Sequence, residues 1–240
     1  LDDYQFHLVV QKLMHFCSIE LGSFYLDVIK DRQYTAKRDS VARRSCQTAL
    51  YHIAEMLVRW LAPICSFTAQ EIWAALPQQL ADGSTRSSYV FTESWYQAAA
   101  EIQVSAEELA RWQTVLEVRD EVNRAIEQAR RDDKVGGSLQ AEVTVYALPE
   151  IAAQLQSLGD ELRFAFITSA VQVEAVATAP EQVNASELAG VWVSVKQSTY
   201  QKCERCWHHR AEVGTIAEHP TLCQRCVTNI DGEGEERRFA

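Results

Sequence analysis

Two closely spaced cysteine pairs near the end of the chain constrain its fold more than any other sequence feature. They are Cys203-Glu-Arg-Cys206 and Cys223-Gln-Arg-Cys226, with sixteen residues between them. Each pair can present two sulfurs from one tight turn, and two facing turns supply the corners of a tetrahedron. The spacing therefore predicts one structural zinc ion bound by Cys203, Cys206, Cys223 and Cys226, with no coordination position left for water.

The alternative for these cysteines is a pair of disulfides in an oxidising compartment. The chain has seven cysteines, an odd number, and it shows no signal-peptide segment and no apolar run of membrane-spanning length. We therefore expect a cytoplasmic, zinc-binding protein without membrane contact. The first residue is Leu1 and a helical pattern is already under way there, so we also expect a piece of a longer protein.

Apolar residues spaced three or four apart predict a mainly helical N-terminal half. A first helix should end near Asp31, followed by a polar connection over residues 32–39, and a second should run from Ser40 to about Pro63. Capping boxes at residues 68–71 and 105–108 mark two further helix starts. The stripe that defines the first helix comprises Phe6, Val10, Leu13, Cys17, Leu21, Phe24 and Val28.

The C-terminal half adds alternating patterns that are typical of half-buried strands. These cover residues 141–148, 171–176 and 191–195, with a short helix expected over residues 149–158. The expected fold class is mainly α. It comprises a helical bundle over residues 1–100, a helix with a small α/β module over residues 101–197, and a four-cysteine zinc knuckle over residues 198–240.

The charge distribution limits the kind of nucleic acid that such a chain could bind. The net charge is −10, yet residues 30–44 contain six Lys or Arg against two Asp. This favours a selective contact with one folded RNA over broad, non-specific binding. No glycine-rich phosphate loop, Gly-x-Ser-x-Gly or His-Glu-x-x-His motif is present, and the pair His208-His209 is expected to be solvated or to face RNA.

Several segments resemble the anticodon-binding bundle and the C-terminal extension of bacterial isoleucyl-tRNA synthetases, a class I family. The resemblance covers nearly the whole chain and is most specific at its two ends. It is carried by residues 24–32, 34–37, 43–51, 61–73, 134–139, 203–208 and 222–227.

This resemblance implies a parent enzyme that uses ATP and Mg²⁺ to attach isoleucine to tRNA(Ile). The His-Ile-Gly-His-like and Lys-Met-Ser-Lys-like signatures of its ATP site and its editing domain are absent here, so this chain should be inactive alone. Its expected partners are tRNA(Ile) and the catalytic and editing domains of the same polypeptide, in a monomer.

Unpaired loop bases are read by aromatic stacking and by hydrogen bonds, with cations on the phosphates. Arg205 and Trp207 are the candidates for base contact, although Trp207 could instead fill the small core of the knuckle. The candidates for contact with the stem backbone are Arg32, Lys37, Arg38, Arg43 and Arg44.

Two other functions remain open at this point. A DNA-repair glycosylase can carry similarly spaced cysteine pairs, but it needs an N-terminal amine nucleophile beside an acid, which Leu1-Asp2 does not supply. A zinc-ribbon scaffold that only docks proteins is the other alternative.

Overall fold

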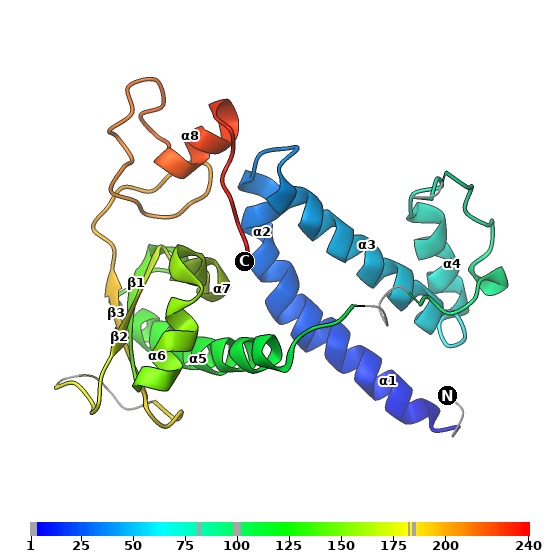
Figure 1. The fold of residues 1–240 in the computed structure, drawn as a ribbon, viewed down its shortest axis with the longest axis horizontal. Coiled ribbons are helices and arrows are strands. Elements are labelled where there is room, and N and C mark those ends of the chain that lie inside the picture. Colours follow the sequence, from blue (N-terminus) through cyan, green and yellow to red (C-terminus); the bar gives the residue numbers. More distant parts are fainter. Residues whose placement is uncertain (1–3, 81–82, 98–101, 182, 184–185) are drawn as a thin grey trace. The chain divides into compact units, whose positions relative to one another are not determined.

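The protein, described here by a computed structural model, forms two compact units (Figure 1). The structure describes residues 4–80, 83–97, 102–181, 183 and 186–240. The larger unit comprises Leu1–Arg43 and Ala106–Ala240, and the smaller unit comprises Arg44–Ser105. Residues 1–43 are thus grouped with the C-terminal half, because Phe24 and Val28 pack into its core. The division into three folding domains stays a prediction, and its first boundary lies partly outside the described residues.

The larger unit begins with a continuous helical segment. It consists of α1 (Phe6–His15), the π-helical η1 (Phe16–Tyr25) and α2 (Leu26–Thr35). The expected end near Asp31 is wrong by one turn, so Arg32 belongs to the helix. Carbonyl groups in the last turn of a helix lack helical partners. Here the Arg205 guanidinium donates a hydrogen bond of 2.5 Å to the Thr35 carbonyl oxygen, which helps to stabilise the additional turn.

A three-stranded sheet forms the centre of the larger unit, in the order β2-β1-β3. The strands β1 (Ala141–Ala147), β2 (Ala170–Ala175) and β3 (Val191–Gln197) lie where alternation predicted them. β1 pairs in parallel with β2 and antiparallel with β3. The chain passes from η4 (Ser138–Gln140) into β1, and from β1 to β2 through α6 (Pro149–Gln156), η5 (Gly159–Glu161) and α7 (Leu162–Phe166).

Helix α5 (Ala106–Arg131) packs against this sheet and supplies one side of the core. Its apolar residues Val115, Val118 and Val122 are fully buried, as is Val145 of β1. Burial of a Val, Leu or Phe side chain contributes about 1.5–3 kcal/mol, so this cluster is the main source of stability in the larger unit. Val28 of α2 joins the same cluster. The end of α2 lies beside the C-terminal cysteine pairs, because Arg205 and Arg225 both donate hydrogen bonds to Thr35.

The C-terminal segment, residues 198–240, is hereafter the zinc tip. It consists mainly of turns and contains one helix, α8 (Gln224–Asp231). Its buried apolar cluster contains the four cysteines, Val213 and the partly buried Leu222. With so few apolar residues, the zinc tip depends on something other than hydrophobic burial for its stability.

The smaller unit contains most of α3 (Val41–Leu61), together with α4 (Ser66–Ala75) and η2 (Val90–Thr92). Its core includes Val58, Trp73 and Val90. The capping box expected at Thr68 is wrong, because α4 already begins at Ser66 and Thr68 lies inside it. The chain turns sharply after α3, and the next helix begins two residues before the expected start at Thr68. At this turn the Ser66 hydroxyl donates a 2.9 Å hydrogen bond to the Ala62 carbonyl oxygen.

Among the described residues, no helix combines the length and the apolar character that crossing a membrane requires.

Candidate metal centre and its surroundings

The four cysteines of the zinc tip converge on one point. Their sulfur atoms all lie within 4.8 Å of one another, and all four side chains are buried. The Sγ atoms of Cys203 and Cys226 are 3.7 Å apart, as are those of Cys206 and Cys223. A tetrahedral zinc ion with Zn–S bonds of about 2.3 Å places its sulfurs about 3.8 Å apart. The arrangement therefore fits a structural zinc ion.

The cysteine geometry also decides between zinc and disulfides. All seven cysteines, which lie in the described part of the chain, are free. A main-chain donor also lies beside the sulfurs, because the Cys223 N–H donates a 3.4 Å hydrogen bond to Cys203 Sγ. Such a contact would offset part of the negative charge of the thiolates around a bound zinc ion. The disulfide alternative is not supported.

The residues directly after the first cysteine pair have roles that the sequence did not indicate. His208 is only 3% exposed, so the expectation that it is solvated is wrong. Its ring packs edge-on against Phe164 at 5.6 Å, and Nδ1 lies 3.1 Å from the Cys206 carbonyl oxygen. Trp207 is 58% exposed. Trp207 therefore does not fill the small core of the knuckle, which consists of the cysteines, Val213 and Leu222, and it remains available at the surface.

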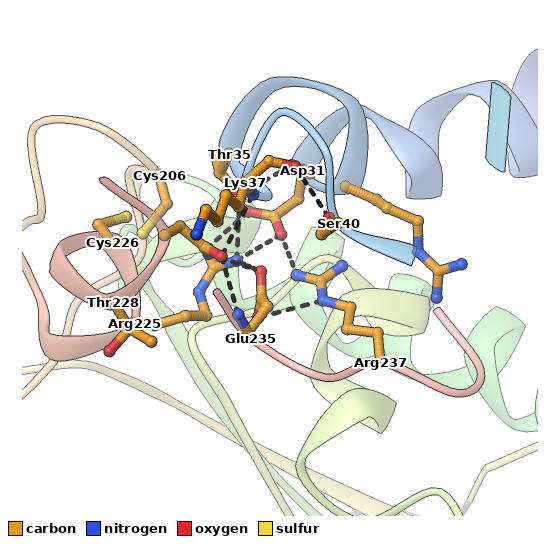
Figure 2. A network of polar contacts seen from close by, with 12 residues as sticks. Asp31, Thr35, Lys37, Ser40, Cys206, Arg225, Cys226, Thr228, Glu235 and Arg237 are labelled. Carbon is orange, nitrogen blue, oxygen red and sulfur yellow. Dashed lines mark hydrogen bonds and ion pairs between the residues drawn. The ribbon is translucent and has the colours of Figure 1, made fainter. Parts of the chain in front are cut away.

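A network of ion pairs attaches the zinc tip to the end of α2 (Figure 2). Arg225, between the cysteines of the second pair, donates two hydrogen bonds of 2.8 and 2.7 Å to the Asp31 carboxylate. Arg237 also pairs with Asp31, and Glu235 lies 3.1 Å from Arg225 and 3.3 Å from Arg237. The Arg225 side chain is only 13% exposed. Its charge serves the attachment of the tip.

Cations of the same network lie against Phe164 and lower the pKa of Asp31. The guanidinium carbons of Arg237 and Arg163 lie 3.4 and 3.9 Å from the Phe164 ring centroid. Such cation–π contacts are strengthened when the cation is desolvated. Burial opposes ionisation of Asp31, but the charges of Arg225 and Arg237 outweigh burial and lower its pKa. Asp31 is therefore a largely buried carboxylate held ionised by two cations.

The basic candidates from the sequence fall into two groups. Arg32 donates a 2.9 Å hydrogen bond to the Ala240 main-chain oxygen, and Lys37 Nζ donates a 3.0 Å bond to the Gly232 carbonyl oxygen. These two hold the zinc tip, as Arg205 does through Thr35. Arg38 and Arg44 are exposed, and Arg43 is half-buried. The sequence holds no local signal that separates the bound cations from the exposed ones, because the acceptors of Arg32 and Lys37 lie about 200 residues further along the chain.

Comparison with known families agrees with this architecture. Residues 1–145 match the family model of the anticodon-binding domain of tRNA ligase, and residues 201–229 match that of a zinc finger found in FPG and IleRS. The first match covers more than half of the chain. This chain belongs to the anticodon-binding domain family of tRNA ligases.

The chain is also similar over its full length to curated proteins named isoleucine–tRNA ligase. It is 66% identical to the one from Idiomarina loihiensis, 60% to that from Shewanella pealeana and 58% to that from Aeromonas salmonicida. It spans 25% of the length of each. The family resemblance expected from the sequence is thus confirmed. The zinc-finger match alone would also admit a glycosylase, but the anticodon-binding match and these relatives do not support that alternative.

Proposed function

We propose that this chain is the anticodon-recognition part of a bacterial isoleucyl-tRNA synthetase. The full polypeptide would use ATP and Mg²⁺ to attach isoleucine to tRNA(Ile) in the cytoplasm, with its catalytic and editing domains outside this chain. It would act as a monomer. This chain alone binds the anticodon stem-loop and is inactive in aminoacylation. The observation that carries the proposal is the anticodon-binding match over residues 1–145, joined in one chain to the zinc-finger match.

The metal has a structural role in this proposal. One Zn²⁺ is held by Cys203, Cys206, Cys223 and Cys226, and it fixes the turn that carries Trp207. An exposed tryptophan on a rigid turn can stack on an unpaired base with little loss of conformational entropy. The zinc tip therefore presents Trp207 for base recognition, while aminoacylation is catalysed elsewhere in the polypeptide.

The basic residues have two different roles in this proposal. Arg38, Arg43 and Arg44 contact phosphates of the stem. Arg38 and Arg44 are exposed, Arg43 is half-buried, and residues 30–44 carry a net positive charge. Arg205, Arg32 and Lys37 act indirectly, since their hydrogen bonds keep the zinc tip in place beside α2.

The test is selective binding at a fixed salt concentration, because phosphate contacts make affinity depend on salt. Fluorescence anisotropy would compare the anticodon stem-loop of tRNA(Ile) with stem-loops from valine and methionine tRNAs. The proposal expects clearly tighter binding of the isoleucine stem-loop. Equal affinity for all three stem-loops, or no binding to any, would refute it and favour the protein-docking scaffold.

A further inference from the structure

The long N-terminal helix of the larger unit contains an unusual segment at its centre. Between α1 and α2, the ten residues Phe16–Tyr25 are π-helical, so their hydrogen bonds reach five residues along the chain instead of four. At the end of this segment the Leu26 N–H donates to the Leu21 carbonyl oxygen. The Ser23 hydroxyl donates a 2.9 Å hydrogen bond to the Ser18 carbonyl oxygen, also five residues away. Such turns are rare and are frequent only at functional sites, so a segment of this length requires a physical explanation.

Gly22 is the residue that permits the π-helical geometry. A β-carbon at position 22 would lie 2.9 Å from the Cys17 carbonyl oxygen, which belongs to the backbone of the same helix. A side chain cannot come that close to a backbone atom, so any other residue would force the segment out of the π form. In an α-helix glycine is instead unfavourable compared with alanine. Glycine at position 22 therefore favours the π form over the α form.

The apolar pattern of the sequence fits an uninterrupted α-helix. Its members are spaced three or four apart throughout, as the α-helical period requires. They are Phe6, Val10, Leu13, Cys17, Leu21, Phe24 and Val28. After the π segment the pattern holds, because Phe24 and Val28 pack in the core of the larger unit. Before it the pattern does not hold, because Phe6 and Val10 are 50% and 39% exposed.

The half-buried side of α1 is displaced by one residue from this pattern. Val9 and Leu13 are the half-buried residues of α1, and Phe16 continues them at α-helical spacing. Position 9 thus takes the place that the pattern assigns to position 10. One residue corresponds to about 100° of rotation around a helix axis. The π segment therefore turns α1 relative to α2, away from the orientation that the apolar pattern favours.

We propose that residues 16–25 act as a register switch, in which the π form exchanges with an α form that turns α1 by about 100°. In the α form Val10 replaces Val9 on the half-buried side. Because α2 holds the zinc tip through Asp31 and Thr35, the switch turns the apolar side chains of α1 relative to the zinc tip. Any contact that covers one face of α1 and not the other shifts the equilibrium between the two forms. The inference does not depend on the proposed function.

The experiment compares thiol labelling at two adjacent positions, Val9→Cys and Val10→Cys, in separate proteins with saturating zinc. Mass spectrometry of the tryptic peptide that ends at Lys12 follows the reaction with a maleimide, since no native cysteine precedes Lys12. Position 10 should react faster than position 9, because Val10 is 39% exposed and Val9 is half-buried. Adding Gly22→Ala should reverse this order. The helix preference of alanine alone shifts the equilibrium roughly fivefold toward the α form, and the contact with the Cys17 carbonyl oxygen shifts it further.

A second measurement identifies the hydrogen bonds directly. NMR couplings across hydrogen bonds should pair the Leu26 N–H with the carbonyl of residue 21 in the wild type and of residue 22 in Gly22→Ala. Ser18→Ala is the matched control, because Ser18 is exposed, lies in the same segment and already has a β-carbon. It should change neither the acceptor nor the order of the labelling rates. Deletion of the exposed Ser23 removes the additional residue, so Gly22→Ala should then have no effect on that order.

Three results would overturn the inference. The first is an unchanged labelling order together with an unchanged acceptor for the Leu26 N–H in Gly22→Ala. The second is unfolding of Gly22→Ala, detected by circular dichroism, because no α form would then be accessible. The third is reversal of the labelling order in Ser18→Ala as well, because Gly22 would then not control the register.

Discussion

Replacing Asp31 by alanine should destabilise the larger unit by about 3–5 kcal/mol, the usual cost of removing one partner from a buried ion pair. The Asp31 side chain is 14% exposed and accepts from two guanidinium groups, of which Arg237 is 1% exposed. Two hydrogen bonds come from Arg225 and one from Arg237. At about 1.5–3 kcal/mol for each charge-assisted bond, their sum of roughly 4.5–9 kcal/mol is an upper bound.

The expected loss lies toward the lower end of the 3–5 kcal/mol range, because Glu235 stays close to both arginines and continues to offset their charges. Amide hydrogen exchange at pH 7 with saturating zinc would measure it, since peptides from β1 and α8 report on the larger unit and those from α4 on the smaller unit. A loss of about 3 kcal/mol raises exchange through global opening roughly 150-fold.

The matched control is Asp27→Ala. Asp27 lies one turn earlier on α2, and its partner Lys30 has a side chain that is 64% exposed, so exchange should change little. A destabilisation of less than about 1 kcal/mol for Asp31→Ala would contradict the argument that this network attaches the zinc tip to α2. Increased exchange confined to α4 would contradict it as well, because α4 belongs to the smaller unit.

Three further predictions follow from the same structure. Chelation of zinc should remove exchange protection and increase protease sensitivity over residues 201–229 but not in α4, because such small modules gain on the order of 10 kcal/mol from the metal; unchanged sensitivity of the tip would argue against this. Glu161→Ala should raise amide exchange at residues 238–240 roughly tenfold or more, since the carboxylate accepts from all three main-chain N–H groups at 2.7–2.9 Å. In the smaller unit, burial opposes ionisation of Glu55, but Arg86 and Arg59 outweigh it and lower its pKa below 4.5. Its stabilising effect should be present above pH 4.5 and lost as the pH falls through the lowered pKa. Glu55→Gln should cost about 3 kcal/mol at neutral pH and flatten this acid dependence, as followed by urea unfolding; an unchanged pH profile would count against the ion pair.

The strands and the convergence of the four cysteines could be predicted because their signals are local. Alternation over residues 141–147 and 191–197 reflects a period of two that one buried sheet face imposes. The ligand spacing of Cys203 and Cys206 reflects the reach of one tight turn. The capping box predicted at Thr68 is wrong because the helix already has its N-cap at Cys65, shortly after Pro63, and begins at Ser66.

Local sequence patterns were enough to predict the four-cysteine cluster, the mainly helical composition, the strands of the small sheet and the family. Which cations are exposed depends instead on tertiary packing. Arg225 and Asp31 are 194 residues apart in the chain, and Lys37 finds its acceptor at Gly232. A charged side chain in a sequence carries no information about its distant partner, so burial of Arg225 and His208 and exposure of Trp207 depend on how α2, α7 and the zinc tip pack together.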